Sequence, residues 1–146
     1  MNRLAPKLVV GNGKPPVKRD MNLIRELLLK LEALPMRMGG IVSIPPDAEE
    51  IAVQGYDVAQ IDYHLGQIRR AGFIDEGGSR PMSGIGFRCL TPHGHDFLDT
   101  VRDPTVWDKT TKAAEKAGAG TLDFFWGIAK EIAKAEIKRH TGFDLQ

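Results

Sequence analysis

The sequence GYDVAQIDYHLGQIRRAGFIDEGG, residues 55–78, is followed by a short Ser/Pro-rich turn and then by IGFRCLTPHGHDFLDTVRD, residues 85–103. The spacing of apolar residues predicts a helix, a strand, a glycine-rich hairpin loop over 77–84, a strand and a second helix, in that order. This is the order of the second half of a winged helix-turn-helix. In that fold one exposed helix and one hairpin are the parts that usually enter the grooves of DNA.

Capping residues mark the helix boundaries in this stretch. Asp57 is a good N-cap for the first helix, and Thr91 is a good N-cap for the second. The apolar face of the first helix is predicted to consist of Val58, Ile61, Leu65 and Ile68. Gly94 leaves room for close packing near the start of the second helix. The pair Asp103–Pro104 ends that helix, because the residue before a proline disfavours helical conformation.

The segment before this stretch is predicted to form one long helix and two short elements. Asp20 is the expected N-cap of the helix, and Pro35 follows its end. Its apolar stripe is predicted to be Leu23, Ile24, Leu27, Leu28, Leu31 and Leu34. Residues 41–44 are consistent with either an edge strand or a linker. Residues 47–53 are consistent with either a helical turn or a short strand.

Two more helices are predicted at the C-terminal end, over residues 105–117 and 122–139, with glycines between them. The predicted organisation is a flexible arm over residues 1–17, a winged-helix domain over 18–103 and a helical extension over 104–146. The expected fold class is α+β and mostly helical: a winged helix-turn-helix with a small β-hairpin wing and two C-terminal helices.

Composition places the chain among ordinary soluble globular proteins, with 146 residues, of which 42% are apolar and 27% charged. The single cysteine, Cys89, has no partner for an internal disulfide, so a cytoplasmic location is expected. The N-terminus carries an apolar run of only three residues, 8–10, which predicts no signal peptide. No stretch approaches the ~20 apolar residues that span a bilayer.

The distribution of charge is more informative than the net charge of +1. Residues 1–17 carry three bases and no acid, and residues 104–146 carry seven bases and six acids. Residues 18–103 carry ten Lys/Arg and thirteen Asp/Glu, a net charge of −3. Binders of nucleic acid usually present a basic field, because neutralising phosphates supplies most of their non-specific affinity. The charge of residues 18–103 therefore disfavours a strongly phosphate-driven binder.

The outward face of the helix that follows Asp57 carries the candidate DNA contacts: Gln60, Tyr63, Gln67 and Arg70. Gln can bond adenine and Arg can bond guanine, while Tyr can reach a phosphate. Arg80, at the tip of the hairpin loop, is a candidate for the minor groove. The alternative interpretation is a solvated helix face beside an ordinary loop arginine.

The histidines and the cysteine do not predict a metal site or a catalytic centre, and no cofactor is expected. His93 and His95 are two apart near the start of a helix, so their side chains diverge by about 200°. His64 is expected to be a packed, hydrogen-bonded histidine, and Cys89 a small residue that is at least half-buried. The sequence has no nucleophile elbow, phosphate loop or paired zinc-ligand motif, so an enzyme is not predicted.

The last predicted helix, TLDFFWGIAKEIAKAEIKRH over residues 121–140, has an aromatic face opposite a lysine row. Such a pattern is typical of a helix that lies on a membrane surface, and equally of one packed on its own domain or on a second subunit. Glu131 and Glu136 dilute the basic face, which favours packing. A homodimer through the C-terminal helices is expected, because it would suit two DNA half-sites about one turn apart.

Four blocks of the sequence resemble a known family. They are KRDMNLIRELLLKLE (18–32), GYDVAQIDYHLGQIRRAGFID (55–75), LTPHGHDFLDTVRDPTVWDK (90–109) and the closing Trp/Lys helix. Together they are similar to the bacterial and prophage family known as domain of unknown function 2513. The resemblance implies a winged-helix fold and a phage or prophage origin, and it carries no activity and no site residues. Residues 1–17 and 36–53 depart from the family pattern.

These observations predict a small DNA-binding regulator that uses the helix after Asp57 and the hairpin wing. The alternative is a protein-interaction module of a phage or mobile element that acts on a host protein without binding DNA. The net charge of residues 18–103 favours this alternative.

Overall fold

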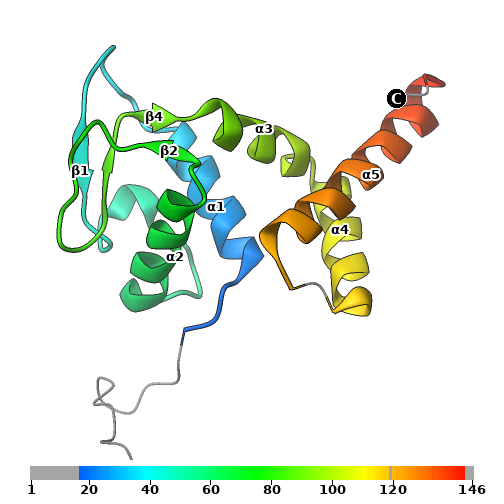
Figure 1. Cartoon of the computed structure of the whole chain (residues 1–146), viewed down its shortest axis with the longest axis horizontal. Coiled ribbons are helices and arrows are strands. Elements are labelled where there is room, and N and C mark those ends of the chain that lie inside the picture. The colour runs from blue at the N-terminus through cyan, green and yellow to red at the C-terminus, as the bar shows by residue number, and fades with distance from the viewer. Residues whose placement is uncertain (1–16, 119, 144–146) are drawn as a thin grey trace, which may run out of the picture.

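The computed structural model describes residues 17–118 and 120–143, and the fold is α+β and mostly helical, as predicted (Figure 1). The predicted arm over residues 1–17 lies outside this part except for Val17. In chain order the elements are α1 (Met21–Glu32), β1 (Val42–Ile44), the 3-10 helix η2 (Glu49–Ile51), α2 (Val58–Arg70), β2 (Ile74–Asp75), β3 (Ile85–Phe87), β4 (Cys89–Leu90), α3 (Pro92–Val101), α4 (Pro104–Ala117) and α5 (Leu122–Thr141).

The strands form two small antiparallel sheets. β1 pairs with β3, so that Ile44 lies opposite Ile85, and β2 pairs with β4, so that Ile74 lies opposite Leu90. After the loop over 77–84 the apolar pattern predicts a single return strand over residues 87–90, and this prediction was wrong in its extent. The return segment begins at Ile85 and divides at Arg88, because its two halves pair with strands from different parts of the chain.

The structure resolves the two alternatives that the sequence left open between α1 and α2. Residues 42–44 form a true strand rather than a linker, and Glu49–Ile51 form a helical turn rather than a strand. Ile44 and Ile51 are buried, which anchors the segment on the core.

The leucine stripe of α1 forms the centre of the core, as predicted. Its buried members are at most 1% exposed: Leu23, Ile24, Leu27, Leu28 and Leu31. Leu34 is partly buried and lies beyond the end of the helix. On α2 the prediction holds for Ile61, Leu65 and Ile68 but is wrong for Val58, which is 47% exposed. Val58 is the first residue of α2, at the N-terminal end of the helix, and it is not part of the core cluster.

An aromatic cluster joins α3 and α5 to the residue that precedes β2. The Phe73 and Phe97 rings stack with centroids 5.0 Å apart, and the edge of Trp126 meets Phe97 at 5.3 Å. Gly94 makes this approach possible, because a Cβ built there would lie 2.1 Å from the carbonyl oxygen of Phe73. The role predicted for Gly94 is therefore confirmed.

Helices α4 and α5 form a hairpin on the side of the molecule away from β1 (Figure 1). α5 packs on α4 and α3, with Phe125, Trp126 and Ala129 buried. Trp107 and these residues belong to the same core cluster as α1, so the extension over 104–143 shares its core with residues 18–103. None of the helices in the described part is both long and apolar enough to cross a membrane.

Candidate nucleic-acid interface

The start of α2 is fixed by a reciprocal pair of hydrogen bonds. The Asp57 carboxylate accepts from the Gln60 backbone N–H at 2.8 Å, and the Gln60 side-chain oxygen accepts from the Asp57 N–H at 2.9 Å. This capping box satisfies two backbone donors that an isolated helix end would leave unpaired. It also occupies the oxygen that Gln60 would need for a bidentate contact with adenine. Gln60 therefore holds the helix start and keeps only its amide NH₂ group for a ligand.

Three of the predicted contacts lie further along the same face of α2. Tyr63 and Arg70 are exposed, and Gln67 is partly exposed. The rings of Tyr63 and His64 pack in a T-shaped arrangement, with their centroids 5.4 Å apart. This outward face therefore presents a phenol, an amide and a guanidinium to solvent, on the side of the helix opposite its buried residues.

Asp62 ties α2 to the hairpin loop. Its carboxylate accepts from the Gly84 backbone N–H at 2.8 Å, just before β3 begins. Gly84 is in the left-handed region, with φ of 73°, and a Cβ there would collide with the backbone of Ile44. This bond could not be predicted from the sequence, because the two residues are 22 positions apart and nothing distinguishes Asp62 from other polar helix residues.

Arg80 lies in the hairpin loop, as predicted, but it is already ion-paired. Its guanidinium donates to the two carboxylate oxygens of Glu76 at 3.1 and 3.2 Å. The bonds and the charge of Glu76 raise the pKa of Arg80. Arg88 likewise pairs with Asp75 at 3.4 Å. The charges of these four residues therefore cancel. To contact a phosphate or a base of DNA, Arg80 would have to break its ion pair with Glu76.

His64 is a core residue with both ring nitrogens occupied, as predicted. It is 1% exposed; its Nδ1 bonds the Gln60 carbonyl oxygen at 2.7 Å, and its Nε2 accepts from the Asp20 backbone N–H at 2.7 Å. A carbonyl can only accept and an N–H can only donate, so the ring is neutral with its proton on Nδ1. His64 thus joins α2 directly to the N-terminus of α1.

A series of hydrogen-bonded polar side chains continues from the His64–Asp20 bond toward α4. The Asp20 carboxylate caps α1 and accepts from the Tyr56 hydroxyl at 2.7 Å. Partial burial, with the Asp20 charge adding to it, raises the pKa of Tyr56. On the other side, the Trp107 indole N–H donates to the Asn22 side-chain oxygen at 3.3 Å. The approach to α2, the start of α1 and the start of α4 are thereby held in one network.

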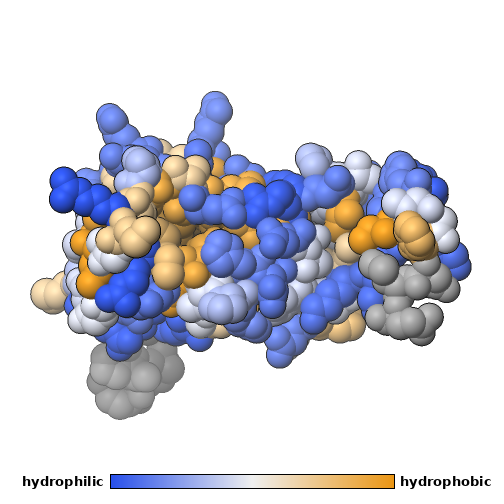
Figure 2. Space-filling model, turned by 90° about the horizontal axis from the view of Figure 1, so that it is seen from above, coloured by the Kyte–Doolittle hydropathy of each residue, from blue (hydrophilic) through white to orange (hydrophobic). Residues whose placement is uncertain are grey.

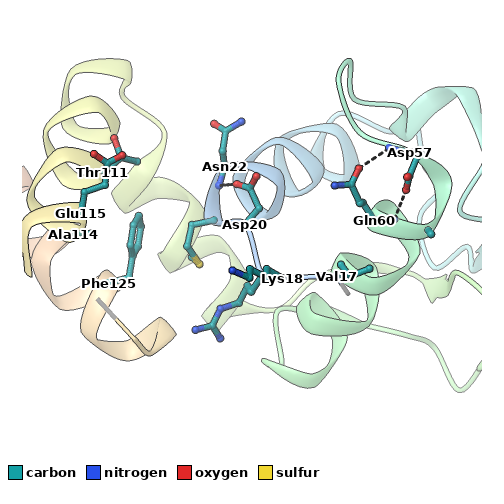
Figure 3. Close-up of a pocket in the computed structure, with 13 residues that line it drawn as sticks. Val17, Lys18, Asp20, Asn22, Asp57, Gln60, Thr111, Ala114, Glu115 and Phe125 are labelled. Carbon is teal, nitrogen blue, oxygen red and sulfur yellow. Dashed lines mark hydrogen bonds between the residues drawn. The ribbon is translucent and has the colours of Figure 1, made fainter. Parts of the chain in front are cut away.

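A groove of ≈ 920 Å³ opens beside this network, between the helix starts of α1 and α2 on one side and α4 with α5 on the other (Figure 3). Lys18 and Asp57 line it from the α2 side, and Glu115 and Phe125 line it from the opposite side. Arg19 also lines it and donates to the Gly120 carbonyl oxygen at 2.7 Å. The groove is thus lined by two bases from the segment before α1, and one of them, Arg19, is bonded to the α4–α5 connection.

The other histidines and the cysteine are placed apart. His93 packs on the rings of Phe73 and Trp126, while His95 lies 4.0 Å from Glu32. Cys89 is exposed, so the expectation that it would be at least half-buried was wrong: it faces solvent in the two-residue strand β4, whose next residue, Leu90, is buried. Within residues 17–118 and 120–143 no three metal-binding side chains come together.

Comparison with known proteins assigns the family. The sequence profile described as "Hypothetical protein (DUF2513)" matches residues 18–120, which span α1 to α4 and include the segment 36–53. An uncharacterized protein of Haemophilus influenzae is 34% identical over 128 residues, covering 84% of this chain and 98% of that protein. No solved structure matches the chain. The chain therefore belongs to the DUF2513 family of hypothetical proteins.

Proposed function

We propose that this protein is a small DNA-binding regulator built on a winged helix-turn-helix, of phage or prophage origin as its family resemblance implies. The observation that supports this proposal best is the placement of α2 and the hairpin loop. The order α1, β1, η2, α2, β2, loop and return strand supports the proposed fold, as does the pairing of β1 with the return strand. The Asp62–Gly84 bond holds the loop beside α2.

The contacts proposed for duplex DNA are Tyr63, Gln67 and Arg70 on α2, with Gln60 at the helix start and Arg80 on the wing. Arg70 is the residue suited to a base contact, because it is exposed and has no ion pair with any described residue. Lys18 and Arg19 would extend the contact to the phosphate backbone from the groove beside the start of α2. No catalytic role is proposed.

The test is selection of duplex fragments from a genomic library at ~100 mM salt, followed by affinity measurement on the selected sequence. Tyr63→Ala/Arg70→Ala is expected to weaken binding by roughly 10-fold or more, since each good base contact supplies ~1–3 kcal/mol. Lys116→Ala, which removes an exposed base from α4, is the matched control and is expected to bind normally. Failure of the folded protein to enrich any fragment would reject DNA binding.

A homodimer through the C-terminal helices is part of this proposal. The buried side of α5 is used within the chain, but Phe124 is 48% exposed and Ile137 is 39% exposed on the same helix. Phe124 is the more exposed of the two and is the residue that we propose at the subunit contact. Phe124→Glu is expected to abolish this contact, measured by sedimentation velocity.

A protein-interaction module is the second candidate, and the paired charges of the wing favour it. Asp75 and Glu76 neutralise Arg88 and Arg80, which leaves the wing without the free bases that a phosphate backbone attracts. Affinity capture from host lysate, with the captured nucleic acid digested before analysis, separates the two candidates. If no host protein remains bound after that digestion, the second candidate is rejected.

A further inference from the structure

The outer edge of β1 is open, on the side of the molecule away from α4 and α5 (Figure 1). β1 pairs with β3 on one side only, and no described strand or side chain bonds its backbone on the other. Unpaired strand edges are templates for another strand, and proteins usually protect them with charged side chains. β1 itself carries no charged side chain, and three apolar residues at or before its start are exposed: Met38, Ile41 and Val42, at 104%, 42% and 40%.

An apolar cavity of ≈ 540 Å³ lies directly beside this edge. Its lining residues are Leu34, Pro35, Met36, Val42, Ser43, Ile44, Pro45, Ala48 and Glu50. Seen from above, apolar side chains gather over the end of the molecule that carries the strands (Figure 2). A strand added to β1 would therefore run past a cavity able to receive an apolar side chain, and this combination is typical of β-augmentation.

The charged residues at the two ends of β1 indicate which partner fits its open edge. Arg37 is exposed before the N-terminal end of β1, whereas Asp47, Glu49 and Glu50 are exposed after its C-terminal end. None of these four residues forms an ion pair with another described residue. In an antiparallel pair of identical strands, the acidic end of each copy lies beside the basic end of the other. The same arrangement would place Met38 of each copy near the cavity of its partner. A two-fold contact requires this kind of self-complementary surface.

We propose that two copies of this protein associate through antiparallel pairing of β1 with β1, which joins the two β1–β3 sheets into one four-stranded sheet. This contact does not depend on DNA binding, and it is distinct from the contact proposed through α5. Only a short strand and a few apolar side chains are covered, so the association is expected to be weak and to require a concentration series up to roughly 1 mM.

The test uses the Phe124→Glu background, so that an α5 contact cannot contribute. In sedimentation velocity this chain is expected to dimerise with rising concentration. Adding Arg37→Glu should shift the midpoint at least 10-fold higher, and Glu50→Arg should do the same on its own. Combining Arg37→Glu with Glu50→Arg is expected to associate better than either single variant, because it restores an opposite-charge pair between positions 37 and 50 of the two copies. Asp47 and Glu49 keep their charge, so the restoration is partial.

Val42→Glu should also abolish the dimer by placing a charge on the edge. Circular dichroism and thermal melting verify that each variant is folded, and α2 is untouched, so DNA binding is scored separately. The proposal is overturned if the Phe124→Glu chain stays monomeric across the whole series, or if the charge-reversed double variant associates no better than the single variants.

Discussion

Gly94 and Gly66 are two helical glycines with opposite surroundings. A Cβ at Gly94 would lie 2.1 Å from the Phe73 carbonyl oxygen, whereas a Cβ at Gly66 would meet nothing within 4 Å. We expect Gly94→Ala to destabilise the fold by ~2–3 kcal/mol or more through overpacking. We expect Gly66→Ala to stabilise it by ~0.5–1 kcal/mol through helix propensity. Urea unfolding of both variants checks the pair, and equal shifts would contradict the packing described for α3.

His64 is the residue on which the α1–α2 contact depends most. His64→Ala removes a buried ring and leaves the Asp20 N–H without its acceptor, so we expect a loss of about 2–4 kcal/mol in unfolding free energy. His95→Ala is the control, because His95 is exposed and should change stability by less than ~0.5 kcal/mol. A His64 variant as stable as the His95 variant would show that the buried ring bonds are unimportant.

At the scale of elements, α1 and α3 are joined by an ion pair between Glu32 and Arg102, with both oxygens bonded at 2.8 Å. These bonds lower the pKa of Glu32 from its ordinary 4.5. The pair therefore stabilises the fold above pH ~4.5 and is lost as pH falls through the lowered value. Because the pair is partly solvent-screened, its contribution is about 1 kcal/mol or less.

The corresponding prediction concerns melting temperature as a function of pH. Glu32→Gln is expected to melt below the wild type at pH 7. This deficit should shrink as the pH falls below 4.5 through the lowered pKa of Glu32, because the wild-type carboxyl then becomes protonated. Lys112→Ala breaks an exposed pair within α4 and should change little across the same pH range. A Glu32→Gln deficit that does not shrink with falling pH would assign the effect to packing rather than to charge.

Elements set by local chemistry were predictable, and those set by distant partners were not. Asp20, Asp57, Thr91 and Thr121 cap their helices as their residue types indicate. The division of the return segment at Arg88 was missed, because it depends on β1, which is more than forty residues away. Periodicity also misplaced Val58, since it assigns residues to a face and does not show where the core ends.

Similar reasons limited the prediction of the candidate interface. The helix face was found from 100° spacing, and Tyr63, Gln67 and Arg70 do share an outward side. Spacing could not reveal that Gln60 is committed to the capping box or that Arg80 is held by Glu76. Those facts follow from side-chain geometry, and they move the expected base contacts toward the second half of α2.

At the scale of the whole molecule, the α4–α5 hairpin shares its core with residues 18–103 rather than forming a separate unit. Arg25 on α1 donates to the carbonyl oxygens of Val101 and Arg102 at the end of α3, and its guanidinium lies 5.3 Å from the centre of the Trp107 ring. Arg25 therefore connects α1 to the end of α3 and to α4.

The proposed contact of α2 and the hairpin loop with duplex DNA is tested by the salt dependence of its affinity. Fluorescence anisotropy on the selected duplex, from ~50 to ~200 mM salt, measures the slope of log K against log salt. With the wing bases paired and few free bases nearby, we expect a shallow slope of roughly −2 to −4. Tyr63→Ala/Arg70→Ala should lower affinity at every salt concentration. No binding at the lowest salt, or unchanged affinity in that double variant, would contradict the claim.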